Sequence, residues 1–124
     1  MKYEKEPKII NKLVRDRIPE LIAANGEDGE YYVYPIDDFE NELILKLQEE
    51  TGEYLESKNP EELADILEVL MELIKIRNFT LSEIDIIRKK KLEERGGFSK
   101  RIFLVKVEEK ENKIDTSEDI NYSC

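Results

Sequence analysis

The sequence predicts a mainly α-helical protein. Apolar side chains recur every three or four residues over 43–54 and again over 66–73, which is the period of helices with one buried face. Asn59-Pro60 between these stretches is a helix-start signal. We therefore expect a helical hairpin plus flanking helices that form an oligomeric core of the four-helix-bundle type, with one minor, short β element.

The predicted helices follow one another along the chain. A short helix ends at the turn-forming Asn25-Gly26. Three long helices follow, over about residues 37–57, 60–77 and 81–95. The last of these opens on a capping box of the Ser/Thr-x-x-Glu kind and ends at two successive glycines.

The predicted β element comes from two short segments. Residues 31–34 are aromatic and β-branched, and residues 101–107 alternate in the manner of a strand. Pro35 ends the first segment. We expect the two segments to pair with each other.

Length and charge narrow the class of protein. The chain has 124 residues, which suits one domain, here placed at 1–107, with an acidic, disordered tail over 108–124. The net charge of −10 argues against binding to nucleic acid or to an anionic membrane. There is no histidine, the single cysteine is Cys124, and no apolar run is long enough for a membrane span. A cytoplasmic location is expected.

Two acids lie where a helix would bury leucines. At about 100° per residue, Glu50 lies about 20° from Leu43, inside the apolar face of the first long helix. On the next helix, Glu62 lies between the directions of Ile66 and Val69. A lone buried carboxylate is costly, so buried acids are normally paired or bound to a metal.

Two further acids, Glu53 and Asp65, lie at the margins of the same faces. The chain reverses near residues 57–59, which places Glu50 and Glu53 beside Glu62 and Asp65 in an antiparallel hairpin. Their axial offsets from the turn are roughly 3–10 Å at about 1.5 Å per residue. Four carboxylates from two helices suit a hard divalent cation, and such a cation suits phosphate chemistry.

Each acid also has a simpler interpretation. Glu62 is the third residue after the helix-start asparagine, so it can serve as the acidic half of a capping box. Glu49 and Glu53 can be ordinary surface acids. Glu50 can reach solvent along its stem or pair with Lys46 one turn earlier. Taken together, two acids on facing apolar stripes favour the metal site.

These residues carry a family pattern. The run Glu49-Glu50-Thr51-Gly52-Glu53, followed by Glu62-Leu63-Ala64-Asp65, resembles the EExxE…ExxD signature of MazG-like proteins, which belong to the all-α nucleoside triphosphate pyrophosphatase superfamily. Three further blocks, at 11–20, 61–69 and 91–98, resemble a house-cleaning subgroup that is similar to phosphoribosyl-ATP pyrophosphohydrolase. The resemblance covers nearly the whole predicted domain.

The resemblance implies an activity and an assembly. It implies hydrolysis of a nucleoside triphosphate to the monophosphate and pyrophosphate, with Mg²⁺, or Mn²⁺ in its place, as the cofactor. It implies a homodimer or homotetramer. The metal ligands of the family map onto Glu50, Glu53, Glu62 and Asp65.

The remaining site residues follow from the chemistry. With no histidine, a carboxylate or a metal-bound hydroxide must accept the proton, and the catalytic candidates are Glu49, Glu50 and Glu53. Phosphate oxygens call for cations, and those inside the family-like blocks are Lys12, Arg15, Lys91 and Arg95. Alternatively, each of these four bases can be an ordinary solvated surface residue with no role in binding phosphate.

Three functions compete at this stage. The first is house-cleaning hydrolysis of a non-canonical or surplus nucleoside triphosphate. The second is hydrolysis of phosphoribosyl-ATP, which shares the chemistry. The third is a non-catalytic acidic helical module that binds a metal or a protein partner. Metal-dependent release of pyrophosphate would distinguish the first two functions from the third.

Overall fold

A computed structural model of the chain describes residues 6–110 and 122. The described part is mainly helical, as predicted, and contains α1 (Ile18–Ala24), α2 (Ile36–Ser57), α3 (Pro60–Ile76) and α4 (Leu81–Arg95). These bounds agree with the sequence pattern to within about one residue for the three long helices, which is the usual uncertainty of helix ends. Among these helices, none is both long and apolar enough to cross a membrane.

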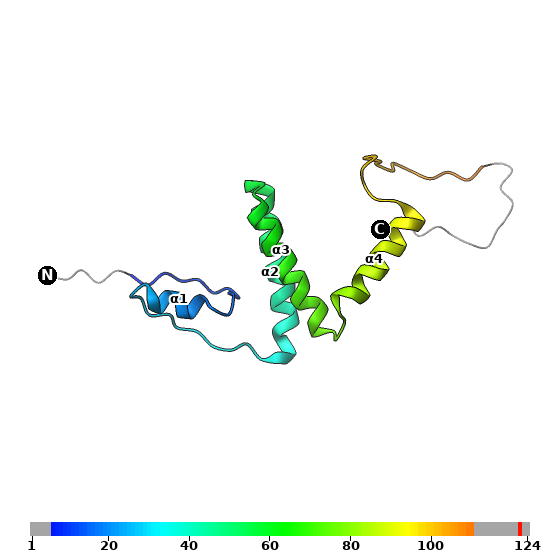
Figure 1. The fold of residues 1–124 in the computed structure, drawn as a ribbon. Helices are drawn as coiled ribbons and strands as arrows, with labels where there is room; N and C mark the ends of the chain where they lie inside the picture. The colour runs from blue at the N-terminus through cyan, green and yellow to red at the C-terminus, as the bar shows by residue number, and fades with distance from the viewer. Residues whose placement is uncertain (1–5, 111–121, 123–124) are drawn as a thin grey trace.

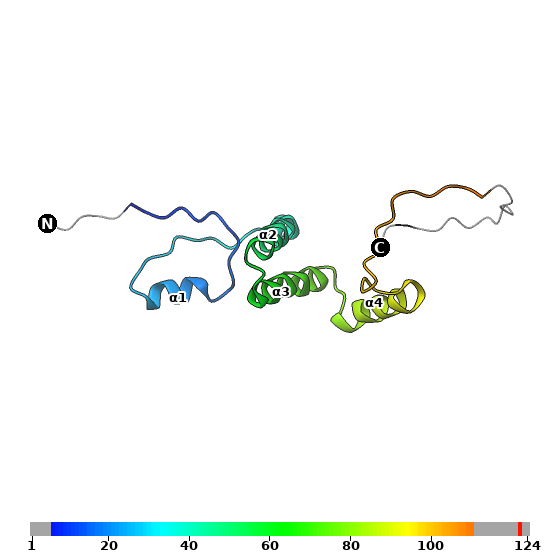
Figure 2. The same cartoon turned by 90° about the horizontal axis from the view of Figure 1, so that it is seen from above.

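The centre of the fold is an antiparallel hairpin of α2 and α3, which lie side by side (Figures 1 and 2). The connection is only Lys58 and Asn59. Lys58 adopts a left-handed conformation with φ of 57°, and its backbone N–H donates to the Tyr54 carbonyl, which closes the end of α2. Pro60 then occupies the first position of α3, where its missing N–H costs nothing. The predicted helical hairpin is confirmed.

The flanking elements leave the hairpin on opposite sides. The N-terminal segment and α1 lie on one side, and α4 lies on the other (Figures 1 and 2). Thr80 and Glu83 form the predicted capping box at the start of α4, and Gly96, with φ of 80°, ends the helix. Because α4 contacts α3 and not α2, the hairpin is covered by other elements over only part of its surface.

The core of a single chain is small. Among the described residues, the buried apolar side chains are Leu43 (3% exposed) and Val69 (8% exposed), one on each helix of the hairpin. The accessible surface is 12,600 Å². A compact monomer of this mass would expose only about 6,900 Å². Many large apolar side chains are therefore exposed in one chain, among them Leu45, Leu55 and Leu67 of the hairpin.

The predicted β element is not found among the described residues. Residues 31–34 and 101–107 belong to no strand, and Arg101 adopts a left-handed conformation with φ of 57°. The reason is spatial, because the two segments lie on opposite sides of the hairpin (Figures 1 and 2). Of the tail expected over 108–124, residues 111–121 and 123–124 lie outside the described part of the chain.

Candidate metal centre

The hairpin gathers acids from both of its helices. Glu49, Glu50 and Glu53 are on the C-terminal half of α2, and Glu62 and Asp65 are on the first two turns of α3. The connection between the helices is short, so these stretches face each other near the closed end of the hairpin. Residues three apart on a helix lie on the same side, which aligns the two acids of α3.

Three of the acids converge. One carboxylate oxygen from each of Glu50, Glu62 and Asp65 can be chosen so that all three atoms lie within 4.8 Å of one another. An ion placed equally far from three oxygens at that spacing would lie about 2.8 Å from each of them. Bound Mg²⁺ and Ca²⁺ lie about 2.0–2.6 Å from their oxygen ligands. Small side-chain movements close that gap. The three acids thus form a cluster that could hold a metal ion.

Glu50 is the buried member of the cluster, as the helical periodicity predicts. The residue is 6% exposed, so its side chain does not reach solvent. Its Oε1 lies 3.4 Å from the Lys46 Nζ, which confirms the predicted pairing one turn earlier. Its Oε2 is buried and has no hydrogen-bond partner among the described residues. A buried oxygen without a partner is costly, and a bound cation would satisfy it.

The alternative role of Glu62 as half of a capping box is wrong. In a capping box the Glu62 side chain would accept from the backbone N–H of Asn59. That N–H donates instead to the Ser57 Oγ at 3.1 Å, and Asn59 makes no side-chain capping bond. The Glu62 carboxyl is therefore available to the acidic cluster.

The electrostatics of the cluster favour protons or a cation. Burial raises the pKa of the Glu50 carboxyl, and the nearby Glu53 carboxyl raises it further. Partial removal from water, together with Glu53, also raises the pKa of the Glu62 carboxyl. Glu53 thus acts on both residues from beside the cluster, although it is not one of the three converging acids. Repulsion of this kind is relieved by a bound metal.

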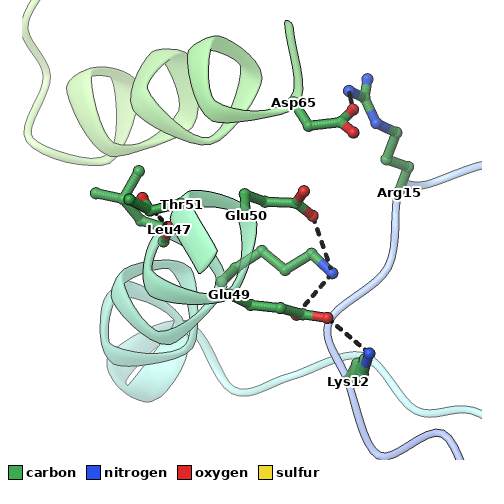
Figure 3. Close-up of polar contacts among 8 residues, drawn as sticks. Lys12, Arg15, Leu47, Glu49, Glu50, Thr51 and Asp65 are labelled. Carbon is green, nitrogen blue, oxygen red and sulfur yellow. Dashed lines mark hydrogen bonds and ion pairs between the residues drawn. The ribbon is translucent and has the colours of Figure 1, made fainter. Parts of the chain in front are cut away.

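Cations from the N-terminal segment contact the acids (Figure 3). The Arg15 Nη2 donates to the Asp65 Oδ1 at 2.6 Å, across 50 residues of sequence. The Lys12 Nζ lies 2.7 Å from the Glu49 Oε1. Of the four bases predicted to bind phosphate, Arg15 therefore contacts a predicted metal ligand and Lys12 contacts the catalytic candidate Glu49. The sequence did not indicate that they would pair with the acids themselves.

Glu49 is held by two lysines. Besides Lys12, the Lys46 Nζ lies 3.0 Å from its Oε2. The hydrogen bond from Lys12 lowers the pKa of the Glu49 carboxyl, and Lys46 lowers it further. Glu49 is therefore an ionised anchor for the N-terminal segment. The lowered pKa makes Glu49 poorly suited to accept a proton.

The other two predicted phosphate ligands lie elsewhere in the chain. Lys91 and Arg95 are on the C-terminal half of α4, which diverges from α2 and α3 in both views (Figures 1 and 2). A single chain does not bring them to the acidic cluster. Their role stays a prediction.

Comparison of the chain with protein-family models, with curated proteins and with solved structures finds no match.

Proposed function

We propose that this protein is a Mg²⁺-dependent hydrolase that converts a nucleoside triphosphate to its monophosphate and pyrophosphate. The observation that carries the proposal is the convergence of Glu50, Glu62 and Asp65 around a buried carboxylate oxygen without a partner. The same three residues belong to the EExxE…ExxD pattern. The converging acids are therefore three of the four ligands that the resemblance implies, and Glu53 is the fourth.

The charge balance supports a divalent ion. The acids of the site and its edge are Glu49, Glu50, Glu53, Glu62 and Asp65, and the bases in ion pairs with them are Lys12, Arg15 and Lys46. Acids therefore exceed bases by two. A single divalent cation would neutralise the excess. Carboxylate oxygens are the ligands that Mg²⁺ prefers in proteins.

Different side chains would have different roles in the reaction. Glu50, Glu62 and Asp65 would hold the ion. When bound, the ion supplies charge neutralisation on the phosphate oxygens and activation of a water nucleophile. Glu53 would accept the proton of that water as its oxygen attacks the α-phosphorus. The bond from this phosphorus to the oxygen bridging to the β-phosphorus then breaks, and pyrophosphate leaves.

The N-terminal segment would supply the contacts to phosphate. Lys12 and Arg15 are more than half exposed at their side chains, so both can turn from the acids to an incoming ligand. Arg15 can bind two phosphate oxygens at once through its planar guanidinium group. This exchange would couple the arrival of an anionic substrate to the release of the Asp65 carboxylate.

Pyrophosphate release tests the proposal. We would assay canonical and modified ribo- and deoxyribonucleoside triphosphates with Mg²⁺ and with EDTA, for the wild type, Glu62→Gln and the matched control Glu61→Gln. Glu61 is the exposed neighbour of Glu62 on the same helix. We expect Mg²⁺-dependent release that falls at least about 100-fold in Glu62→Gln and is unchanged in Glu61→Gln.

Two results would contradict the proposal. Release that persists in EDTA would exclude the metal mechanism. Mg²⁺ binding by calorimetry without release from any nucleotide would leave a non-catalytic metal-binding module.

A further inference from the structure

We propose that residues 102–107 of one copy of this chain pair, as an extended strand, with residues 30–34 of a second copy. This contact lies outside the acidic cluster and uses none of its residues. It would therefore stand or fall independently of the proposed activity.

Both segments have the exposure of strands that lack a partner. Val33 is 88% exposed, and in the other segment Phe103 is 89% and Val105 is 83% exposed. Among the described residues, no backbone hydrogen bond involves 30–34 or 102–107. Extended backbone with unpaired N–H and C=O groups and large apolar side chains is a template for pairing with another chain.

The charges of the two segments are complementary. Residues 27–34, which are the first segment and the three residues before it, carry three acids and no base. The acids are Glu27, Asp28 and Glu30. Residues 100–107 carry three bases and no acid. Lys100 and Arg101 lie in the turn just before the second segment, and Lys106 lies within it, where it pairs with Glu108. Opposite charges across neighbouring strands stabilise a pair, and like charges destabilise it. Each segment would disfavour a second copy of itself and favour the other.

The arrangement of the chain points to a second copy as the partner. Residues 30–34 enter α2 on one side of the hairpin, and residues 102–107 follow α4 on the other side (Figures 1 and 2). The two segments of one chain are thus separated by the hairpin. Two copies related by a twofold axis would make the contact twice, because each copy contributes one segment of either kind.

The exposed area is large enough for such an assembly. The chain exposes 12,600 Å², about 5,700 Å² more than a compact monomer of its mass. A standard stable interface buries only about 800 Å² from each partner. The excess is sufficient for this contact and for further packing of the uncovered helix faces.

Photochemical cross-linking tests the pairing in the full-length protein. Phe103 is replaced by p-benzoylphenylalanine, and the matched control carries the same group at Leu55, an exposed apolar residue of α2. We expect ultraviolet light to produce a dimer-sized product from the Phe103 variant, with the cross-link mapped to residues 30–34. The Leu55 variant should give no cross-link to that segment.

Other mapped outcomes would overturn the proposal. A cross-link from position 103 to residues 30–34 in a monomer-sized product would show that the segments pair within one chain. A dimer cross-linked at other residues, or the absence of a dimer, would equally exclude the proposed contact.

Charge reversal gives a second, independent test. We expect Lys100→Glu with Arg101→Glu to weaken self-association about tenfold at low salt, as measured by sedimentation. Adding Glu27→Lys and Glu30→Lys to the same chain should restore association. Failure of the second pair to rescue the first would contradict the pairing.

Discussion

Replacing Glu50 by glutamine should change stability and metal binding in opposite directions. Glu50 is 6% exposed, and its Oε2 is buried without a hydrogen-bond partner among the described residues. Glutamine has the same shape and no charge, and its amide can donate to the Glu53 or Glu62 carboxylate. Lys46 would keep its contact with Glu49 at 3.0 Å, so no cation is left unpaired.

The magnitudes follow from the buried oxygen and from the ligand count. An unsatisfied buried polar group costs about 1–3 kcal/mol. We therefore expect the metal-free Glu50→Gln variant to gain about 1 kcal/mol, which raises Tm by about 4 °C for a domain of this size. Removing one of three anionic ligands should weaken Mg²⁺ binding at least about 100-fold, which is about 2.7 kcal/mol of metal-dependent stabilisation.

Thermal unfolding with Mg²⁺ and with EDTA measures both effects. Glu56→Gln, an exposed acid on the same helix, is the matched control and should behave as the wild type. If Glu50→Gln instead lowered the metal-free Tm and kept the full response to Mg²⁺, Glu50 would be a structural partner of Lys46. The assignment of the metal centre would then be refuted.

Two further predictions concern the charges around the cluster. Arg15→Gln should strengthen Mg²⁺ binding to the free protein about two- to fivefold, because an exposed ion pair worth up to about 1 kcal/mol no longer competes for Asp65. The same variant should also raise the KM for the nucleotide. Calorimetry measures the Mg²⁺ affinity and initial rates measure the KM. Arg17→Gln is the control, because Arg17 pairs with Glu20 away from the cluster. Burial, and then the neighbouring acids, raise the pKa of Glu50. The folded state therefore holds this proton more tightly than the unfolded state, and the metal-free fold loses stability as pH rises above about 4.5 through that pKa. The gap in Tm between the wild type and Glu50→Gln should therefore widen from pH 4 to pH 8 in EDTA and close in Mg²⁺, and a constant gap would contradict the assigned pKa direction.

The hairpin and its buried acid are predictable because their determinants are local. Helix period places Glu50 among apolar residues, and Pro60 and the Thr80 capping box mark the starts of α3 and α4. A short connection then leaves only one way for two helices to meet. The facing of Glu50, Glu62 and Asp65 follows from these facts alone.

Contacts between distant segments are not predictable in the same way. Arg15 and Asp65 are 50 residues apart, and their side chains are 58% and 37% exposed, so no periodicity marks the pair. The alternation over 101–107 predicts a strand, but Arg101 has φ of 57° and the structure assigns these residues to no strand. The alternation carries no information about where a partner lies, and the helices between 31–34 and 101–107 separate the two segments.

The ion pairs of the N-terminal segment give the metal-free site a defined state. Lys12 and Arg15 neutralise Glu49 and Asp65, but neither base reaches the buried Oε2 of Glu50. Burial and the neighbouring acids instead raise the pKa of the Glu50 carboxyl. A divalent ion would have to displace the Arg15 guanidinium from Asp65 before it could bind all three acids. Metal binding and movement of the N-terminal segment are therefore expected to be one coupled event at this site.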